Sequence, residues 1–386
     1  MTTPHPGLSG GPVYLDYNAT TPVDPSVAAV ALPYLHTQFG NPSSSHRYAD
    51  APRAAISQSR EQVAALLGCR AEEIVYTGGG SEGDTLALRG VVLAHGGRGD
   101  HVITQQTEHP AVLQTCRSLQ RLHGVRVTYL RADQYGLVDP GDLEEAITPR
   151  TVLVSIMHAN NETGTVQPIR DLAAITRRHG VLLHSDPAQS VGKIPVSVEE
   201  LGIDLLSIAG HKLYAPKGVG ALYVRAGVRL EPSVYGGGQE RGVRAGTENV
   251  ALIAALGQAA LIARTELPDS QTRLRRLRDL LQARLQERLH GRVRLNGHPT
   301  HRLPNTLNVS IDGAGGEQLL AATPGVAAST GSACHEGHDE PSGVLLAMGM
   351  SRERALSAVR LSVGRWTSEE DVEYATAALA QGSAQI

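Results

Sequence analysis

The segment Asp204-Leu-Leu-Ser-Ile-Ala-Gly-His-Lys-Leu-Tyr-Ala-Pro-Lys-Gly218 changes from an apolar run to polar residues interspersed with Gly and Pro. The apolar part, Ile203 to Ile208, predicts a strand, and Lys212 follows where that strand ends. A second run, Val181 to Leu183, is followed in the same way by His184-Ser-Asp-Pro-Ala-Gln-Ser190. Ligands bind at such strand ends in open α/β sheets. Both segments therefore predict an α/β fold with a ligand site at one edge of its sheet.

Lysine is scarce in this chain, whose three lysines are Lys193, Lys212 and Lys217. A lysine amine beside a carboxylate suits a Schiff base with pyridoxal phosphate, because an aspartate keeps the ring nitrogen of that cofactor protonated. Lys193 and Lys217 lie in turn-like sequence, where solvated charges are the simpler interpretation. Lys212 could also be a surface lysine. We favour a cofactor lysine because polar residues suited to such a site follow the neighbouring strands, namely Asp186, Gln189 and His211.

The composition indicates an ordinary globular protein. The chain has 386 residues, of which 41% are hydrophobic, and this length predicts one large and one smaller core. The formal net charge of −3 predicts no direct nucleic acid binding. We expect a cytoplasmic protein, since the start lacks a leader pattern and no later run approaches the roughly 20 apolar residues of a membrane span. The three cysteines, Cys69, Cys116 and Cys334, lie far apart and argue against a disulfide framework.

Short apolar runs alternate with helical stretches in the first two thirds of the chain, which predicts βαβ units and a mostly parallel sheet. The strands expected first are 74–77, 101–104 and 151–156. After Asn249 we expect a long helix that breaks near Pro268. Its leucines at three- and four-residue spacing predict a core stripe of Leu274, Leu277, Leu281, Leu285 and Leu289. The remainder mixes helices with short strands, expected at 306–311 and 359–361.

Two glycine-rich segments suit an anion. Thr77-Gly-Gly-Gly-Ser-Glu82 precedes a predicted helix, whose free amides and positive dipole end favour a phosphate. A plain turn explains three glycines equally well. The second segment, Tyr235-Gly-Gly-Gly-Gln-Glu-Arg-Gly-Val-Arg-Ala-Gly-Thr-Glu-Asn249, carries two arginines and Thr247.

Other polar residues lie at predicted strands or their ends. His109 follows the strand at 101–104, where an imidazole could stack on an aromatic cofactor and transfer protons, although a lone histidine is usually structural. The segment Asn160-Asn-Glu-Thr-Gly164 closes the strand at 151–156, and its amides could reach a ring hydroxyl or a substrate carboxylate. Arg360 lies on an otherwise apolar predicted strand and needs an acidic partner. A substrate carboxylate and an internal salt bridge are equally good candidates for that partner.

Cys334 lies in a polar, glycine-containing stretch that predicts a functional loop. The flanking His335 and His338 could lower the pKa of its thiol. An inert thiol is one alternative, and a metal site that also uses Asp339 is another. Four ligands within six positions match no usual zinc spacing, so we expect no metal. Cys69 and Cys116 are interpreted as core thiols.

With these residues together, the chain resembles the NifS/IscS-type cysteine desulfurases, fold-type I pyridoxal phosphate enzymes of the class V aminotransferase group. The resemblance extends from Tyr14 to about Arg365. The blocks that carry it are Phe39-Gly-Asn-Pro-Ser43, Thr107-Glu-His109, Ser155-Ile-Met-His-Ala-Asn-Asn-Glu-Thr-Gly164, Ala188-Gln-Ser-Val-Gly192, Gly210-His-Lys212, Gly236-Gly-Gly-Gln-Glu-Arg241 and Gly331-Ser-Ala-Cys334. The resemblance implies a large cofactor domain (17-260) with a mostly parallel seven-stranded sheet. It also implies a small α+β domain (1-16 and 261-386) that carries the cysteine loop.

The resemblance also assigns a role to each candidate residue. Lys212 would hold pyridoxal phosphate and move the substrate Cα proton, Asp186 would face the ring nitrogen, and Gln189 the ring hydroxyl. His109 would stack on the ring, while Asn161 and Arg360 would bind the substrate carboxylate. The residues expected at the phosphate are Gly80, Ser81, His211 and, from the second subunit of a homodimer, Thr247. Cys334 would take the sulfur of L-cysteine as a persulfide and release L-alanine.

Departures from the family pattern leave alternatives open. Ala209 stands where the family usually has serine, which removes a hydroxyl from the phosphate site. The chain ends soon after Thr376 and lacks an extension that helps to dock the iron-sulfur scaffold, which hints at tRNA thiolation or DNA phosphorothioation proteins as sulfur acceptors instead. The rival functions are a selenocysteine lyase or other class V enzyme, and a non-catalytic paralogue that serves as a binding platform.

Overall fold

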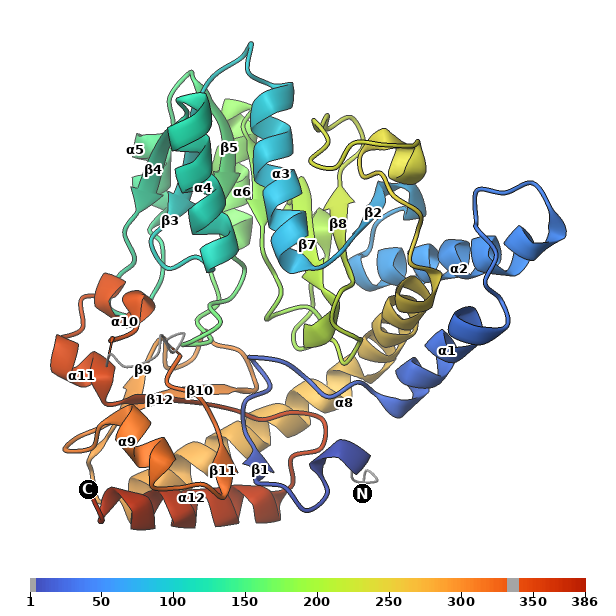
Figure 1. Cartoon of the computed structure of the whole chain (residues 1–386). Coiled ribbons are helices and arrows are strands. Elements are labelled where there is room, and N and C mark those ends of the chain that lie inside the picture. Colours follow the sequence, from blue (N-terminus) through green and yellow to red (C-terminus); the bar gives the residue numbers. More distant parts are fainter. Residues whose placement is uncertain (1–4, 332–339) are drawn as a thin grey trace.

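A seven-stranded sheet forms the centre of the larger part of the molecule (Figure 1). The structure is a computed structural model that describes residues 5–331 and 340–386. The strand order is β2-β8-β7-β6-β5-β3-β4, and β8 runs antiparallel to both of its neighbours. The expected α/β fold with a mostly parallel sheet is confirmed. The strands are β2 (Ile74–Thr77), β3 (His101–Gln105), β4 (Arg126–Leu130), β5 (Thr151–Ser155), β6 (Leu182–Ser185), β7 (Leu205–Ala209) and β8 (Gly220–Val224).

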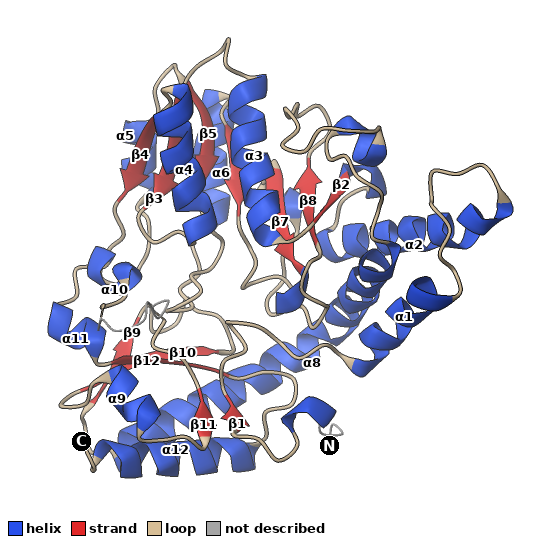
Figure 2. Cartoon of the chain, viewed as in Figure 1, coloured by secondary structure: helices blue, strands red, loops and turns tan. Residues whose placement is uncertain are grey.

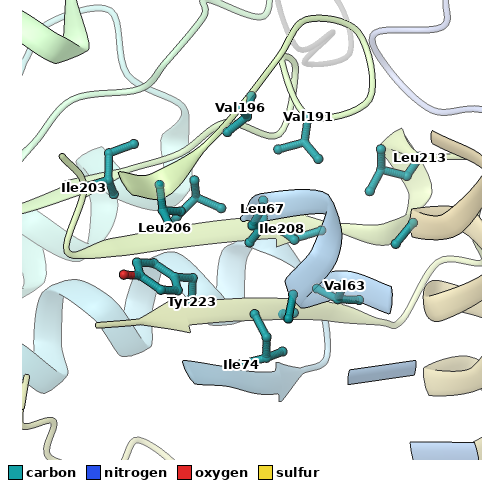
Figure 3. Close-up of a cluster of buried hydrophobic side chains, with 14 of the residues drawn as sticks. Val63, Leu67, Ile74, Val191, Val196, Ile203, Leu206, Ile208, Leu213 and Tyr223 are labelled. Atoms are coloured by element: carbon teal, nitrogen blue, oxygen red, sulfur yellow. The ribbon is translucent and has the colours of Figure 1, made fainter. Parts of the chain in front are cut away.

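Helices cover both faces of this sheet, as Figure 2 shows. Successive strand residues point to opposite faces, so Leu205 packs beneath the helices of one face while Leu206 belongs to the core of the other. Figure 3 shows part of this second core, which includes Leu206, Ile208 and Val63. The helices that follow the strands are α3 (Gly80–Ala94), α4 (Pro110–His123), α5 (Pro140–Ala146), α6 (Ile169–His179) and α7 (Val198–Leu201).

Three helices outside the alternating pattern extend the larger core. They are α1 (Pro25–His36), α2 (Asp50–Leu67) and α8 (Val250–Arg288). Asp24 caps α1 by accepting a hydrogen bond from the amide of Ser26, and Pro25 occupies its first turn. α2 and α1 both pack along α8.

The expected break of the long helix at Pro268 is wrong, because α8 continues through this residue. Proline removes one helical hydrogen bond and frees the carbonyl four residues earlier, at Arg264. Arg264 and Pro268 are both exposed, so water can satisfy the freed carbonyl and the helix survives. The continuous helix also contains an 18-residue window of mean hydropathy 1.5 that passes the length and hydropathy test for a membrane span. Half of that window is buried inside the protein, as in a core helix.

A smaller α+β unit lies beside the second half of α8. The expected leucine core is confirmed, since Leu274, Leu277, Leu281, Leu285 and Leu289 are all buried in one cluster. A three-stranded antiparallel sheet consists of β9 (Val293–Asn296), β10 (Thr306–Ile311) and β12 (Ala358–Ser362), and β1 (Val13–Tyr14) pairs in parallel with β11 (Val326–Ala327). The helices of this unit are α9 (Gly316–Ala321), α10 (Gly343–Ala347), α11 (Arg352–Leu356) and α12 (Glu369–Ser383). These separate clusters support a division near residues 16 and 260, which stays a prediction.

Candidate active site

A cavity of about 380 Å³ lies at the carboxyl ends of the parallel strands, where the two parts of the molecule meet. It collects nine of the residues predicted from the sequence: Gly80, Ser81, His109, Asn161, Asp186, Gln189, His211, Lys212 and Arg360. They come from segments that are far apart in the chain. Each segment begins where a strand of the large sheet ends, except Arg360, which lies on β12 of the smaller sheet.

Main-chain oxygens hold the amine of Lys212 near the carboxyl end of β7. Lys212 ends a short 3₁₀ turn, Gly210–Lys212, that directly follows β7. Its Nζ donates hydrogen bonds to the carbonyl oxygens of Asn18 at 2.5 Å and Ala19 at 2.7 Å. Burial lowers the pKa of Lys212 to about 8, and the charge of Arg360 acts in the same direction, against Asp186 and Asp16. Near neutral pH a useful fraction of this amine is therefore unprotonated and nucleophilic.

Asp186 is a buried carboxylate one residue beyond β6. Its Oδ1 accepts a hydrogen bond from the amide of Ala188 at 2.9 Å. Burial raises the pKa of Asp186, while the charges of His109 and Lys212 favour its ionised form. A buried acid of this kind can hold a proton or pair with a protonated ring nitrogen.

His109 caps helix α4. Its Nδ1 accepts a hydrogen bond from the amide of Ala111, and Pro110 occupies the first helical position. The ring is exposed at the cavity, yet surrounding protein atoms desolvate it. This desolvation lowers the pKa of His109, with a further contribution from Lys212, although Asp186 opposes both. With Nδ1 as acceptor, the neutral ring carries its proton on Nε2.

The glycine-rich segment places the N-terminus of α3 at the cavity. Gly79, before the first turn, has a φ of 149°, which favours glycine, and no side chain of the described residues caps this helix end. Gly80 lies so close to β7 that a Cβ there would approach the Cβ of Ala209 to 3.1 Å. The amides of a free helix end favour an anion such as a phosphate. His211 lies beside it, and burial lowers the pKa of His211 to about 4, so this ring is neutral.

Arg360 forms the internal salt bridge that its sequence position allowed, and its role toward a substrate carboxylate stays a prediction. Its Nη2 donates to Asp16 at 2.8 Å in an internal salt bridge, and its Nη1 donates to the carbonyl oxygen of Asn161 at 3.1 Å. The side chain also lines the cavity, and its Nε has no partner among the described residues. An anionic ligand could therefore reach a guanidinium that Asp16 already holds in place.

One predicted residue, Thr247, lies elsewhere, and another, Cys334, is not among the residues that the structure describes. Thr247 lines another cavity, of about 190 Å³, together with Glu240 and Arg244. It does not contribute to the Lys212 cavity within the described part of its own chain. Cys334 and its neighbours His335, His338 and Asp339 lie outside the described residues.

Comparison with known proteins shows which family the chain belongs to. The model of the class-V aminotransferases matches residues 13–375. A curated cysteine desulfurase IscS of Dictyoglomus turgidum is 45% identical over 364 residues, which cover 94% of this chain and 92% of that protein. The chain belongs to the cysteine desulfurase family of class-V aminotransferases.

Solved structures of similar proteins share the fold over nearly the whole chain. A NifS-like protein superimposes with a TM-score of 0.91 at 35% identity, covering 97% of this chain and 100% of the other. SspA in complex with cysteine gives a TM-score of 0.79 at 37% identity, covering 91% of this chain and 98% of the other. Both likenesses show that the fold of this family member extends over nearly the whole chain.

The sequence did not identify every residue of the cavity. Asp84, on α3, lines it, and Oδ1 of Asp84 is buried without a hydrogen-bond partner in the described part of the chain. Asp84, His109 and Asp186 bring their ligand atoms within 4.8 Å of one another, a spacing that a metal ion could use. The nearby amine of Lys212 opposes a cation there. An acid on an otherwise apolar helix face, four residues after Gly80, was the available signal for Asp84.

The burial of the other lysines and of two cysteines can be compared with what the sequence predicted for them. Lys217 is exposed, as predicted, but the interpretation of Lys193 as a solvated charge is wrong, because this residue is buried. Cys116 is buried and Cys69 half-buried, and both are free thiols. Burial raises the pKa of each to about 12, which fits unreactive core positions.

The lowered pKa of Lys212 predicts unusual reactivity. In cofactor-free protein, acylation of Lys212 should be half-maximal near pH 8, more than two units below an ordinary lysine. Replacing the cationic neighbour in Arg360→Met should move this midpoint upward, whereas Arg98→Met on the surface should not. Peptide mapping after acylation at graded pH measures the midpoint. A midpoint near the ordinary lysine value would contradict the assignment.

Asp84 should make stability depend on pH. Burial raises the pKa of Asp84 well above its ordinary value, with Asp186 contributing. The folded protein then retains a proton that the unfolded chain loses at about pH 4, so this residue costs stability increasingly as pH rises above that value. The melting temperature of Asp84→Asn, relative to that of the wild type, should therefore rise as the pH increases from about 5 to about 8. The exposed Asp142→Asn serves as control, and parallel pH profiles of Asp84→Asn and wild type would refute this account.

Proposed function

We propose that this chain is a pyridoxal phosphate-dependent cysteine desulfurase that converts L-cysteine to L-alanine and carries the sulfur as a persulfide on Cys334. One observation carries this proposal: a lysine amine of lowered pKa shares a cavity with a buried carboxylate, in a chain of the desulfurase family. A surface lysine would have neither property.

The residues of the cavity fit pyridoxal phosphate. The uncapped end of α3 supports a phosphate site at Gly80 and Ser81, with His211 beside it. Asp186 is a buried acid suited to a pyridine nitrogen, and Gln189 offers an amide for a phenolic oxygen. Lys212 would hold the cofactor through Nζ. Ala209 supplies no hydroxyl at the phosphate, so the helix end and His211 carry more of that interaction.

When bound, pyridoxal phosphate supplies an electron sink for the Cα of an amino acid. The protein residues do the remaining work. With the cofactor bound, Asp186 would keep a proton at the ring nitrogen, and the amine of Lys212 would take the Cα proton and return protons to carbon. His109, whose pKa is lowered, would cover the ring and assist proton transfer through Nε2. Arg360 and Asn161 orient the substrate through its carboxylate, and the bond from Arg360 to Asp16 keeps the guanidinium aimed.

Sulfur transfer then needs one thiol. The thiolate of Cys334 attacks the substrate sulfur, an S–S bond forms, and the C–S bond breaks. The electron pair of the broken bond stays on Cβ, which is protonated to give the methyl group of alanine. The transferred sulfur is oxidised as Cβ is reduced, so L-cysteine and one thiol yield L-alanine and one persulfide without an external oxidant.

A homodimer would complete the site. Thr247 lies outside the Lys212 cavity of its own chain, which supports a role in the cavity of a second subunit. The segment after α1 also exposes large apolar side chains: Phe39 and Tyr48 are 71% and 67% exposed and stack on each other at 5.6 Å, and Leu32 and Leu35 lie nearby on α1. Figure 1 shows this segment at the outer end of α1 and α2. A second copy would cover such a surface.

The sulfur acceptor is proposed as a protein, because a persulfide on Cys334 must pass to another thiol or scaffold. An iron-sulfur scaffold, a tRNA-thiolation protein and a DNA-phosphorothioation protein all remain candidates, and trapping the mixed disulfide of Cys334 would identify the acceptor.

We also propose a cytoplasmic location, because free thiols and a persulfide need a reducing compartment. Cell fractionation tests that location.

Two substitutions separate the candidate functions. Lys212→Ala should abolish alanine release from L-cysteine and remove the visible absorbance of the cofactor, while Lys217→Ala retains both. Cys334→Ser should lose at least about a hundredfold in desulfuration, since no other group replaces the nucleophile. Release of alanine from L-selenocysteine should survive Cys334→Ser. Full desulfuration by Cys334→Ser would favour a selenocysteine lyase, and absence of cofactor absorbance in the wild type would favour a non-catalytic binding platform.

The dimer has its own test. Light scattering should give a mass of two chains for the wild type, and Phe39→Asp should shift the population towards one chain because it charges the exposed surface. Leu122→Asp, at an exposed leucine on α4, is the matched control and should leave the mass unchanged. A wild-type mass of one chain would refute the dimer.

A further inference from the structure

Lys193 is a buried lysine that none of the roles above uses. It follows β6 in the turn after Gln189 and is 5% exposed. Burial lowers the pKa of Lys193 to about 7, with Lys212 and Arg360 contributing. Its two hydrogen-bond acceptors, the main-chain oxygen of Gln189 at 3.0 Å and Oε1 of Gln189 at 3.2 Å, are neutral. Burying an amine against neutral oxygens costs stability, so a lysine here calls for a functional reason.

The contacts of Gln189 fix which way its side-chain amide points. Oε1 accepts from Nζ of Lys193, and Nε2 donates to the carbonyl oxygen of Asn18 at 2.9 Å. A carbonyl oxygen can only accept, and an ammonium group can only donate. These two neighbours therefore select the same orientation, with Oε1 toward Lys193 and Nε2 toward the cavity wall formed by Asn18.

The main-chain oxygen of Asn18 also connects Gln189 and Lys193 to Lys212. The carbonyl oxygen of Asn18 accepts from Nε2 of Gln189 and also from Nζ of Lys212. Gln189 lines the cavity already described, whereas Lys193 lines a second cavity of about 290 Å³, and Lys212 lines both. Lys193 thus contacts the Lys212 cavity through the Gln189 amide, while its charge also acts on Lys212 and Arg360 over a longer distance.

We propose that Lys193 is a positioning residue that holds the Gln189 amide with its donor, Nε2, available to the phenolic oxygen of pyridoxal phosphate. This inference rests on the proposed function. Without Lys193, Oε1 of Gln189 would be buried without this donor, and the carbonyl oxygen of Asn18 alone would select the orientation of the amide. The amide could then rotate more often and present Oε1 to the cofactor instead. An acceptor facing the phenolic oxygen would repel its deprotonated form.

The test uses the full-length, cofactor-loaded protein and follows cofactor absorbance as a function of pH. Lys193→Met retains the length of the side chain but removes its donor. The titration midpoint should rise by about 0.5 to 1 pH unit, the effect of one lost hydrogen bond to the deprotonated form. Lys193→Arg retains a donor and should shift the midpoint less. Lys217→Met, on the exposed lysine, is the matched control and should give the wild-type value.

A double substitution separates positioning from a direct effect of charge. In a Gln189→Leu background the amide is gone, so adding Lys193→Met should produce no further shift. A further shift in that background, or an unshifted midpoint in folded Lys193→Met, overturns the inference. Where Lys193→Met does not fold, Lys193→Gln, which is polar but shorter and does not reach Oε1, carries the same expectation. Absence of cofactor absorbance in the wild type would instead overturn the proposed function.

Discussion

The amine of Lys212 and the buried carboxylate of Asp186 share one cavity. Removing both groups from water costs free energy, and the surrounding structure offsets this cost. Desolvation raises the pKa of Asp186 and lowers that of Lys212, and the charge of each group favours the charged form of the other. Strands β6 and β7 end side by side in the sheet, which brings the two groups together without a long loop. The open end of α3 and the guanidinium of Arg360 then supply positive potential for the anionic parts of a cofactor and its substrate.

The site exists only where distant parts of the chain meet. Asn18 and Asp16 come from the N-terminal segment, Lys212 from the centre and Arg360 from the last strand. Asp16 also bridges to Ser362, and the amide of Asn18 donates to the hydroxyl of Ser362, so the N-terminal segment is tied to β12. Contacts of such sequence separation carry a large loop-closure entropy cost. Catalytic geometry is therefore coupled to the association of the two cores.

Local pattern predicted much of this arrangement. Apolar runs located the strands, and the polar residues directly beyond them, such as Lys212 and Asp186, were recognisable because parallel strands end at one edge. Whether a single side chain is buried or exposed was harder to predict. Lys193 and Lys217 lie in similar turns, but the first points inwards and the second into solvent, and tertiary packing alone decides this. Pro268 predicted a break that exposure to water made unnecessary, and the paired roles of Arg360 required knowledge of Asp16 across 344 positions of the chain.

The acceptors that hold Lys212 are main-chain oxygens of Asn18 and Ala19. Every amino acid carries this oxygen, so the side chain at position 19 can drift over evolutionary time while the lysine stays tethered. Sequence divergence in that loop is consequently a poor measure of whether the anchoring has been lost. Only a change in the path of the chain, by insertion, deletion or a residue that redirects the turn, would release it.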